Sequence, residues 1–238
     1  MHLLASWRNL AAALALSSFS LLHGAAPDPQ LVKARDQQNL QALDGIIARS
    51  KKAADADAKA ADAQYKLALA YSYAAEVATE QRDKRKAEGY ATAGLDAANR
   101  AVAANGSNAE YHRLLGALCG QVIPANPLLG SLKYGSCARD EINKAIALNG
   151  NLAIAYVSRG IGNYYLPAQM GGGVDIALKD IDKAIALDPK LADAYLWRGV
   201  ILHKANRNAE ARQAFSEALK LDPNRVWAKQ QLDKTPAQ

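Results

Sequence analysis

Two cysteines are the clearest candidates for chemistry in this sequence. Cys119 and Cys137 lie eighteen positions apart, and two thiols in one chain form one disulfide bond when the protein folds in an oxidising compartment. The alternative is two free thiols buried in the core, where cysteine behaves as a small apolar residue. We expect the disulfide, provided that the chain is exported and that its secondary structure brings the two residues close together.

The other reactive side chains form no catalytic or metal-binding pattern. His112 and His203 are far apart in the sequence and lack the paired spacing of zinc ligands. The sequence contains no Gly-x-Ser-x-Gly, no His-Glu-x-x-His and no phosphate-loop motif. Asp188 and Asp222 each precede a proline and are typical of helix ends rather than of a catalytic acid pair. We therefore expect a protein that is not an enzyme and that needs no cofactor or metal.

The first 26 residues predict export. Arg8 is the only charged residue before Asp28, an apolar run begins at Leu10, and small residues follow at 24–26. This order is that of a secretory signal peptide, and the run is shorter than the roughly 20 apolar residues that span a membrane. The alternative is an N-terminal anchor that is not cleaved. We expect a signal peptide at 1–26 and a periplasmic or secreted mature chain without an integral membrane span, a location that allows a disulfide.

The composition of the 238-residue chain favours helices. Hydrophobic residues make up 50% of the chain, but only 6% of its residues are aromatic, whereas the strands of a β-sandwich need many β-branched and aromatic side chains. The net charge of +6 is spread along the chain, and its densest run, at 82–86, includes an acidic residue, Asp83. Because no basic stripe is interleaved with stacking aromatics, we do not expect nucleic-acid binding.

The sequence contains four copies of one segment. The copies start at Ala98, Ile142, Ile181 and Phe215, at successive offsets of 44, 39 and 34 residues. Each copy has apolar residues at helical spacing and ends in Asn-Gly or Asp-Pro, which stops a helix. An offset of about 34 residues is the period of a tetratricopeptide (TPR) helical hairpin. The alternative, an unrelated helical bundle, does not explain four copies in phase.

A second segment repeats as well and completes each hairpin. The segment that starts at Leu152 matches the one that starts at Leu191, and corresponding segments start at Ala61 and Ala109. Small residues in such a hairpin let its two helices approach closely, while large residues are expected to fill the space against the neighbouring hairpin. The last hairpin resembles the TPR family most closely, because the family's aromatic, small, large and proline residues are present at Tyr195, Gly199, Leu202, Ala211, Phe215, Ala218 and Pro223.

This resemblance implies an all-α fold, a right-handed superhelical TPR solenoid of about four helical hairpins. An N-terminal helix over 29–50 and a C-terminal capping helix over 224–233 are expected to cover the two ends of the stack. The TPR domain then occupies 27–238. Its hairpins are expected at 61–106, 109–150, 153–189 and 192–223.

The repeat phasing also brings the two cysteines together. Cys119 lies in the first helix of its hairpin, and Cys137 lies at the predicted start of the second helix. Because the two helices run side by side, we expect a Cα separation in the range of about 4.4–6.8 Å that a disulfide requires.

Three of the hairpins are longer than the TPR period. In the first hairpin the additional residues lie at 78–88, where we expect them to extend both helices. In the second and third hairpins they lie at 122–135 and 166–173, where we expect them to form connections. Long connections in a solenoid lie on one face and often carry function. The last one is expected to make a turn at the rim of the binding groove, and the alternative is that its amides bind an anion at the start of the next helix. Its turn-forming residues are Pro167, Gly171, Gly172 and Gly173.

A closer resemblance covers about 60–223. Tyr164-Tyr165-Leu166-Pro167, followed by the three glycines at 171–173 and a helix with Ala177 and Ala184, resembles the T-component family of TRAP transporters. The related regulator-of-microtubule-dynamics family shares this architecture. The resemblance implies a periplasmic helical-repeat protein that accompanies substrate-binding proteins. This chain departs from the lipoprotein members, because it lacks a lipobox cysteine near the end of the signal segment.

The TPR resemblance further implies where a partner binds. In TPR proteins the groove is lined by fixed positions of the first helices, and here these positions are apolar and rich in tyrosine, with few charges. Aromatic anchors suit a peptide or a helix of a partner protein. The alternative is that the same side chains pack against the chain's own N-terminal helix. The groove residues are Tyr65, Tyr73, Arg113, Gln121, Tyr164, Tyr165, Leu196 and His203.

Two functions follow from such a groove. The first is an exported scaffold that binds proteins through a Tyr-rich concave surface. The alternative is a periplasmic carrier of a small apolar ligand, or a transporter-associated component of the T-component type, with the superhelix closed around an apolar channel. An open groove would favour the scaffold, and a buried pocket through the middle would favour the carrier.

Overall fold

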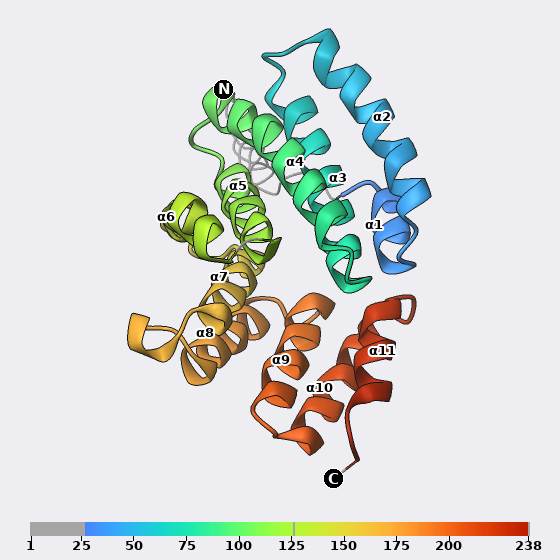
Figure 1. The fold of residues 1–238 in the computed structure, drawn as a ribbon, viewed down its shortest axis with the longest axis vertical. Helices are drawn as coiled ribbons and strands as arrows, with labels where there is room; N and C mark the ends of the chain where they lie inside the picture. The colour runs from blue at the N-terminus through green and yellow to red at the C-terminus, as the bar shows by residue number, and fades with distance from the viewer. Residues whose placement is uncertain (1–26, 126, 238) are drawn as a thin grey trace, which may run out of the picture.

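The computed structural model describes residues 27–125 and 127–237, which contain eleven α-helices and no strand (Figure 1). The expected signal peptide lies outside the described residues. No helix in the described ranges is long and apolar enough to cross a membrane. The helices are α1 (Pro29–Asp36), α2 (Leu40–Ala56), α3 (Ala61–Glu80), α4 (Lys84–Ala104), α5 (Ala109–Val122), α6 (Pro127–Leu148), α7 (Ala153–Tyr165), α8 (Val174–Leu187), α9 (Ala192–Lys204), α10 (Asn208–Leu221) and α11 (Val226–Lys234).

Helices α3 to α10 form four hairpins, in each of which two consecutive helices pack along each other. Small residues of the first helix allow this packing. A Cβ atom on Gly199 of α9 would lie 2.5 Å from the ring of Phe215 in α10. A Cβ atom on Gly160 of α7 would lie 2.9 Å from the side chain of Ile181 in α8. Each large residue of the second helix therefore occupies the space that the missing Cβ leaves.

The N-terminal segment forms two helices, whereas the sequence predicted one helix over 29–50. Gln38 interrupts it with a φ angle of 53°, a left-handed conformation that ends a helix. The side chain of Asn39 then accepts a hydrogen bond from the amide of Ala42 and caps α2. This break separates α1, which contacts α3, from α2, which packs along α3 and extends the stack.

The excess in the second hairpin lengthens a helix and does not form a long loop. A short 3-10 turn, Ile123–Ala125, follows α5, and α6 then begins at Pro127. Proline is well tolerated in the first turn of a helix, because its missing N–H needs no partner there. Cys137 therefore lies inside α6 rather than at its start. The disulfide is nevertheless present, with a Cα separation of 6.1 Å to Cys119.

The connection between α7 and α8 is a tight turn around a second 3-10 segment, Ala168–Met170. Gly171 and Gly173 have φ angles of 86° and 112°, which glycine adopts without strain. The amides of all three glycines donate to backbone carbonyls, those of Ala168, Pro167 and Asn163. Since these amides are engaged within the chain, the geometry favours the turn-forming role over anion binding.

Most of the buried apolar side chains belong to one of two separate clusters. The first extends from Leu31 to Val122 and belongs to α1–α5, with side chains of α6 packed against it. The second extends from Val157 to Ala228 and belongs to α7–α11. We refer to α1–α6 as the first half of the structure and to α7–α11 as the second half. The short turn at 149–152 connects them.

Candidate binding surface

The first helices of the four hairpins form one layer of the structure. Helices α3, α5, α7 and α9 pack against one another in this order, and α1 lies against α3. The side chains that this layer presents away from the second helices form the inner face of the superhelix. The sequence-predicted groove residues all belong to these four helices.

Tyr65 of α3 and Arg113 of α5 share one acidic partner, Glu110. The Tyr65 hydroxyl donates to the Glu110 carboxylate over 3.1 Å, and the Arg113 guanidinium donates to the same group over 2.7 and 2.5 Å. The ring of Tyr65 also stacks on Tyr111 at 5.1 Å between centroids. Burial and the neighbouring Glu110 raise the pKa of Tyr65, so that its hydroxyl stays a hydrogen-bond donor. Two predicted groove residues thus lie together at the junction of α3 and α5.

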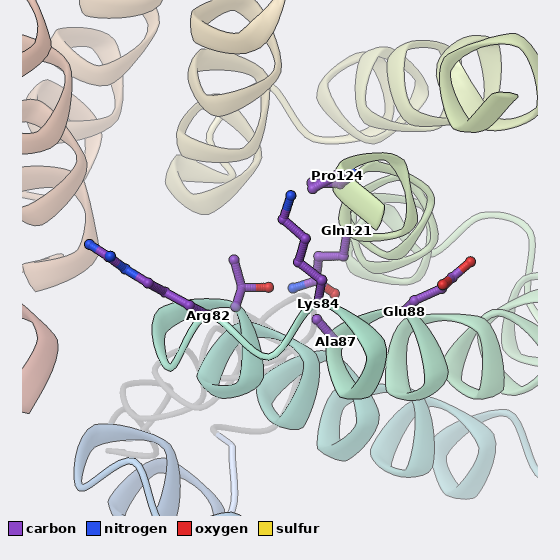
Figure 2. Close-up of a pocket in the computed structure, with 7 residues that line it drawn as sticks. Arg82, Lys84, Ala87, Glu88, Gln121 and Pro124 are labelled. Atoms are coloured by element: carbon purple, nitrogen blue, oxygen red, sulfur yellow. The ribbon is translucent and has the colours of Figure 1, made fainter. Parts of the chain in front are cut away.

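Gln121, near the end of α5, links α3 and α5 at a second point. Its amide nitrogen donates to the Ser72 carbonyl over 3.2 Å, and its amide oxygen accepts from the Ser72 hydroxyl over 3.1 Å. Gln121 also borders a shallow hollow of about 220 Å³ between the α3–α4 turn and the end of α5 (Figure 2). In Figure 2 the Lys84 side chain reaches toward Pro124, while Arg82 points away from the hollow. The hollow is lined by Thr79, Arg82, Lys84, Ala87, Glu88, Gln121 and Pro124.

Tyr73 packs against the chain's own N-terminal helix. The Arg35 guanidinium of α1 lies 4.8 Å from the centroid of the Tyr73 ring, a cation–π contact. Burial raises the pKa of Tyr73 to about 12. The alternative raised from the sequence, in which groove residues contact the N-terminal helix, therefore applies at this position.

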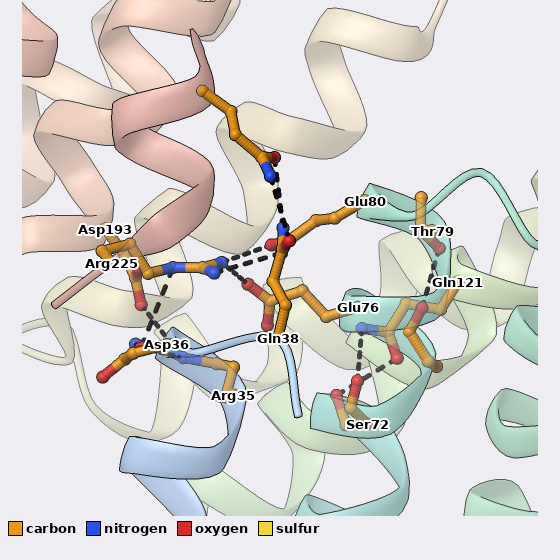
Figure 3. A network of polar contacts seen from close by, with 12 residues as sticks. Arg35, Asp36, Gln38, Ser72, Glu76, Thr79, Glu80, Gln121, Asp193 and Arg225 are labelled. Carbon is orange, nitrogen blue, oxygen red and sulfur yellow. Dashed lines mark hydrogen bonds and ion pairs between the residues drawn. The ribbon is translucent and has the colours of Figure 1, made fainter. Parts of the chain in front are cut away.

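The inner face near α1 is charged, and the expectation of a groove with few charges is wrong here. Arg225, the residue before α11, donates to Glu76 over 2.5 Å and also pairs with Glu80, both of α3. Arg35 pairs with Asp36 beside it and, over 2.8 Å, with Asp193. Figure 3 shows the Arg225 guanidinium between the α3 carboxylates and α1. We call this set the ion-pair cluster: Arg35, Asp36, Glu76, Glu80, Asp193 and Arg225.

Burial changes the protonation of the ion-pair cluster. It raises the pKa of Glu80 to about 7, an effect that the nearby Glu76 carboxylate reinforces and that Arg225 only partly offsets. Burial likewise raises the pKa of Asp36 to about 6 against the opposing effect of Arg35. At Asp193 burial opposes ionisation, but Arg35 and Arg225 outweigh it and lower the pKa. Carboxylates in one cluster thus differ in their readiness to bind a proton.

Tyr164 and Tyr165, at the end of α7, form an aromatic pair beside the turn at 166–173. Their ring centroids are 4.8 Å apart in an edge-to-face arrangement. Tyr165 exposes 65% of its surface, and Tyr164 is half-buried. Within the described part of the chain neither hydroxyl forms a hydrogen bond. Tyr165 is therefore available to a partner, whereas Tyr164 also packs against the second apolar cluster.

Two of the predicted groove residues are engaged elsewhere. Leu196 exposes 1% of its surface and belongs to the second apolar cluster. The His203 ring nitrogen Nδ1 lies 2.8 Å from the side-chain oxygen of Asn208 at the start of the next helix. We therefore do not retain these two residues in the proposed binding surface.

Reasoning from the sequence did not predict the ion-pair cluster, although the position of one member could have pointed to it. Asp193 occupies the second position of its helix, counted from Ala192, and this is one of the positions that line the groove in TPR proteins. Nothing in the sequence connects it with Arg35, which lies 158 positions earlier.

His112, the other histidine considered from the sequence, is fully buried and contacts Glu141 of its own hairpin over 2.5 Å.

Comparisons with known proteins agree with this architecture. The family model described as regulator of microtubule dynamics protein 1-3 matches residues 30–167, and a tetratricopeptide repeat model matches residues 170–226. A curated relative, regulator of microtubule dynamics protein 3 of Bos taurus, is 32% identical over 95 residues. That match covers 40% of this chain and 20% of the relative. The chain thus aligns with about a fifth of the length of that relative.

A solved structure shows the same fold. A thermophilic TPR protein of Thermus thermophilus, TTC0263, superposes with a TM-score of 0.60 at 18% identity, over 86% of this chain and 97% of that one. A crystal structure of MamA has a TM-score of 0.42 at 23% identity, over 80% of this chain and 94% of that one. The predicted TPR solenoid is confirmed. Since the first family model matches more than half of the chain, this protein belongs to the regulator of microtubule dynamics protein 1-3 family.

Proposed function

We propose that this protein is an exported scaffold that binds a peptide or helical segment of a partner protein on the inner face of its TPR solenoid. The observation that supports it most directly is the Tyr164–Tyr165 pair on α7, in which Tyr165 exposes 65% of its surface. Tyrosine anchors a partner well, because it offers a large apolar ring and a polar hydroxyl at a small cost in side-chain entropy. The turn at 166–173 borders this pair and contributes to the rim.

The inner face supports a polar as well as an aromatic contribution to binding. Arg113 and Tyr65 are held in place by Glu110, and Gln121 is held by Ser72. Side chains that are fixed before binding lose less entropy when a partner docks. We infer that the partner segment lies along α5 and α7, between the Tyr65–Arg113 junction and the Tyr164–Tyr165 pair.

The carrier alternative receives less support. A carrier of a small apolar ligand needs an apolar channel through the superhelix, whereas the ion-pair cluster places charged groups between α1, α3, α9 and α11. The role in transport that the T-component resemblance implies stays a hypothesis. The tetratricopeptide repeat match supports a binding role, and we propose that role without catalysis.

Export is part of the proposal. The disulfide between Cys119 and Cys137 supports it, because disulfides persist in oxidising compartments such as the periplasm or the extracellular space. Fractionation of the producing cells, with detection of the protein by antibody in the periplasmic, secreted and cytoplasmic fractions, tests the location directly.

Photo-crosslinking tests the binding surface. A photoreactive phenylalanine derivative placed at Tyr165 is expected to capture a defined partner, which mass spectrometry then identifies. The double variant Tyr164→Ala/Tyr165→Ala should weaken binding of that partner by roughly tenfold or more, since truncation of a buried aromatic anchor costs about 1–2 kcal/mol or more. The matched control is Tyr90→Ala on α4, a second helix, where the hydroxyl binds Asp44.

The outcomes separate the two functions. Unchanged binding by the double variant would exclude this surface, and loss of helical content in circular dichroism would assign both tyrosines to the core. Native mass spectrometry of the purified protein provides the test of the carrier. A small molecule that co-purifies in equal amount with the protein, in place of a protein partner, would favour the carrier.

A further inference from the structure

The two large apolar clusters of the structure lie in different halves, one in α1–α5 and one in α7–α11. Along the chain the halves meet where α6 and α5 contact α7. The turn between α6 and α7, at 149–152, contains a glycine, Gly150. This junction is suited to act as a hinge, because few residues have to change their backbone angles when the halves rotate.

On the other side of the superhelix the halves meet through polar contacts. Arg225 of the second half pairs with Glu76 and Glu80 of α3. Asp193 of α9 pairs with Arg35 of α1. Figure 3 shows these contacts together in one place, and in Figure 1 α11 lies next to the ends of α1 and α3.

A pair of amides adds to this junction. Gln38 and Gln230 exchange hydrogen bonds of 3.3 and 3.2 Å, and Gln38 also donates to Glu80 over 2.8 Å. The sequence separations across the junction range from 145 to 192 positions. The junction therefore forms only when the whole superhelix has the curvature that brings its two ends together.

Three members of the ion-pair cluster are deeply buried. The side chain of Arg225 exposes 2% of its surface, that of Glu80 3% and that of Asp36 5%. Removing such charges from water costs free energy of about the same size as the attraction that the pairs regain. The free energies of the closed and the open arrangement are therefore similar, which would not be the case for an apolar interface. A change in the charge of one member is then enough to favour one arrangement over the other.

The cluster contains more acidic than basic groups. It has four carboxyl groups, those of Asp36, Glu76, Glu80 and Asp193, and two guanidinium groups. The groups that face it from neighbouring elements are Tyr73 of α3, Arg113 of α5 and Asp222 at the end of α10. Arg113 is paired with Glu110 and does not balance the excess. With every carboxyl group ionised, the closed junction therefore confines uncompensated negative charge.

We propose that the ion-pair cluster is a proton-sensitive latch that closes the superhelix by joining α1 and α3 to α9 and α11. When the buried Glu80 carboxyl group binds a proton, three carboxylates remain beside Arg35 and Arg225, the excess of negative charge falls from two to one, and the halves close. When that proton is lost, the carboxylates repel one another, and the halves separate by rotation about the α6–α7 turn. The latch concerns the conformation of the chain and does not depend on the proposed binding function.

The direction of the pH effect follows from burial. A group that is buried only in the closed state has a higher pKa there than in the open state, where water reaches it, and Glu80 at about 7 and Asp36 at about 6 fit this description. The closed state then binds more protons than the open state between the open and the closed pKa. Closure is favoured as pH falls from about 8 to about 6, and opening is favoured as pH rises.

Distance measurements between the halves test the latch. Spin labels are attached to Thr92→Cys on α4 and Lys229→Cys on α11, two exposed positions, while the native disulfide keeps Cys119 and Cys137 unreactive. Pulsed electron paramagnetic resonance then reports the distance distribution. We expect one narrow distribution at pH 6 and, at pH 9, an additional population at longer distance.

Three variants that carry the same two spin labels test whether the ion-pair cluster controls the distance between the halves. Arg225→Gln removes one of the two cations that join the halves and is expected to show the longer distance at both pH values. Glu80→Gln keeps the hydrogen-bonding shape without the charge, and it is expected to stay closed at pH 9. The matched control is Arg198→Gln, whose ion pair with Asp182 lies within the second half and on the surface, and it should behave as the parent chain does.

Identical distance distributions at pH 6 and pH 9 in the parent chain would overturn the proposal. A Glu80→Gln variant that opens at pH 9 as the parent chain does would overturn the assignment to this cluster. Circular dichroism at both pH values accompanies each measurement. If Arg225→Gln loses its helical content, the parent chain and Glu80→Gln, compared at the two pH values, still decide the question.

Discussion

Arg225 and Glu80 lie 145 positions apart in the sequence and form an ion pair in which the two side chains expose only 2% and 3% of their surface. Arg225 precedes α11, and Glu80 is the last residue of α3. The pair therefore joins the two ends of the superhelix. Because neither group reaches water, each depends on the other for its stability in the folded chain.

Removing the cation of this pair should destabilise the protein strongly. Arg225→Leu leaves the buried Glu80 carboxylate with only the Gln38 amide as a partner and removes the cation beside Glu76, and we expect a loss of about 3–5 kcal/mol in the free energy of unfolding. Urea denaturation followed by circular dichroism measures it. Arg198→Leu, which breaks an ion pair at the surface, should cost less than about 1 kcal/mol. Equal losses in the two variants would show that burial of the pair is unimportant.

The free energy of unfolding should decrease as pH rises from about 4 to 7. Burial raises the pKa of Glu80 from 4.5 to about 7 and that of Asp36 from 3.8 to about 6. A raised folded-state pKa contributes stability that is complete below the unfolded-state pKa and that is lost as pH rises through the folded-state pKa.

Urea denaturation at pH 5 and at pH 7.5 measures this contribution. For Glu80 it is on the order of 2 kcal/mol. Glu80→Gln should reduce the difference between the two pH values, whereas Glu88→Gln, an exposed position on α4, should leave it unchanged. A stability that rises between these pH values in the parent chain would contradict the prediction.

Reduction of the disulfide should lower the stability of the second hairpin. The bond closes a loop with a sequence separation of 18 residues, and a loop of this length contributes about 3 kcal/mol. Thermal unfolding with and without reductant gives the effect, and intact mass after alkylation counts the thiols. Two alkylated cysteines in protein that was never reduced would show that the bond is absent in solution.

Two glycines in helices should respond differently to the same substitution. Gly199→Ala places a Cβ atom 2.5 Å from the Phe215 ring, so that α9 and α10 have to move apart, and we expect a loss of about 1–3 kcal/mol. Gly89→Ala on α4 meets nothing within 4 Å. It should stabilise the protein by up to about 1 kcal/mol, because alanine favours the helix. Thermal unfolding of both variants tests the close approach within the hairpin.

The features that the sequence predicted well are local. Helical periodicity, the Asp188-Pro189 type of helix end and the matching of small with large residues act within one hairpin, over a few tens of residues. The disulfide belongs to the same class, because Cys119 and Cys137 lie in paired helices of one hairpin. The presence of four hairpins and of this bond could therefore be worked out from spacing.

The positions of the groove residues could not be predicted from local spacing alone. Repeat numbering assigned Leu196 and Tyr165 to one surface, yet Leu196 exposes 1% and Tyr165 65%. Which positions of a helix reach the inner face depends on how that helix is rotated against its neighbours.

The sequence by itself determined the α-helical hairpins, their order and the disulfide, because each depends on contacts between residues that are close along the chain. Only the tertiary structure decided the break at Gln38, the helical start of α6 and the meeting of Arg35 with Asp193 and of Arg225 with Glu80. The small rotation between successive hairpins adds up along the solenoid. Whether the two ends of the solenoid meet depends on the total rotation over all hairpins, and no local pattern in the sequence specifies that total.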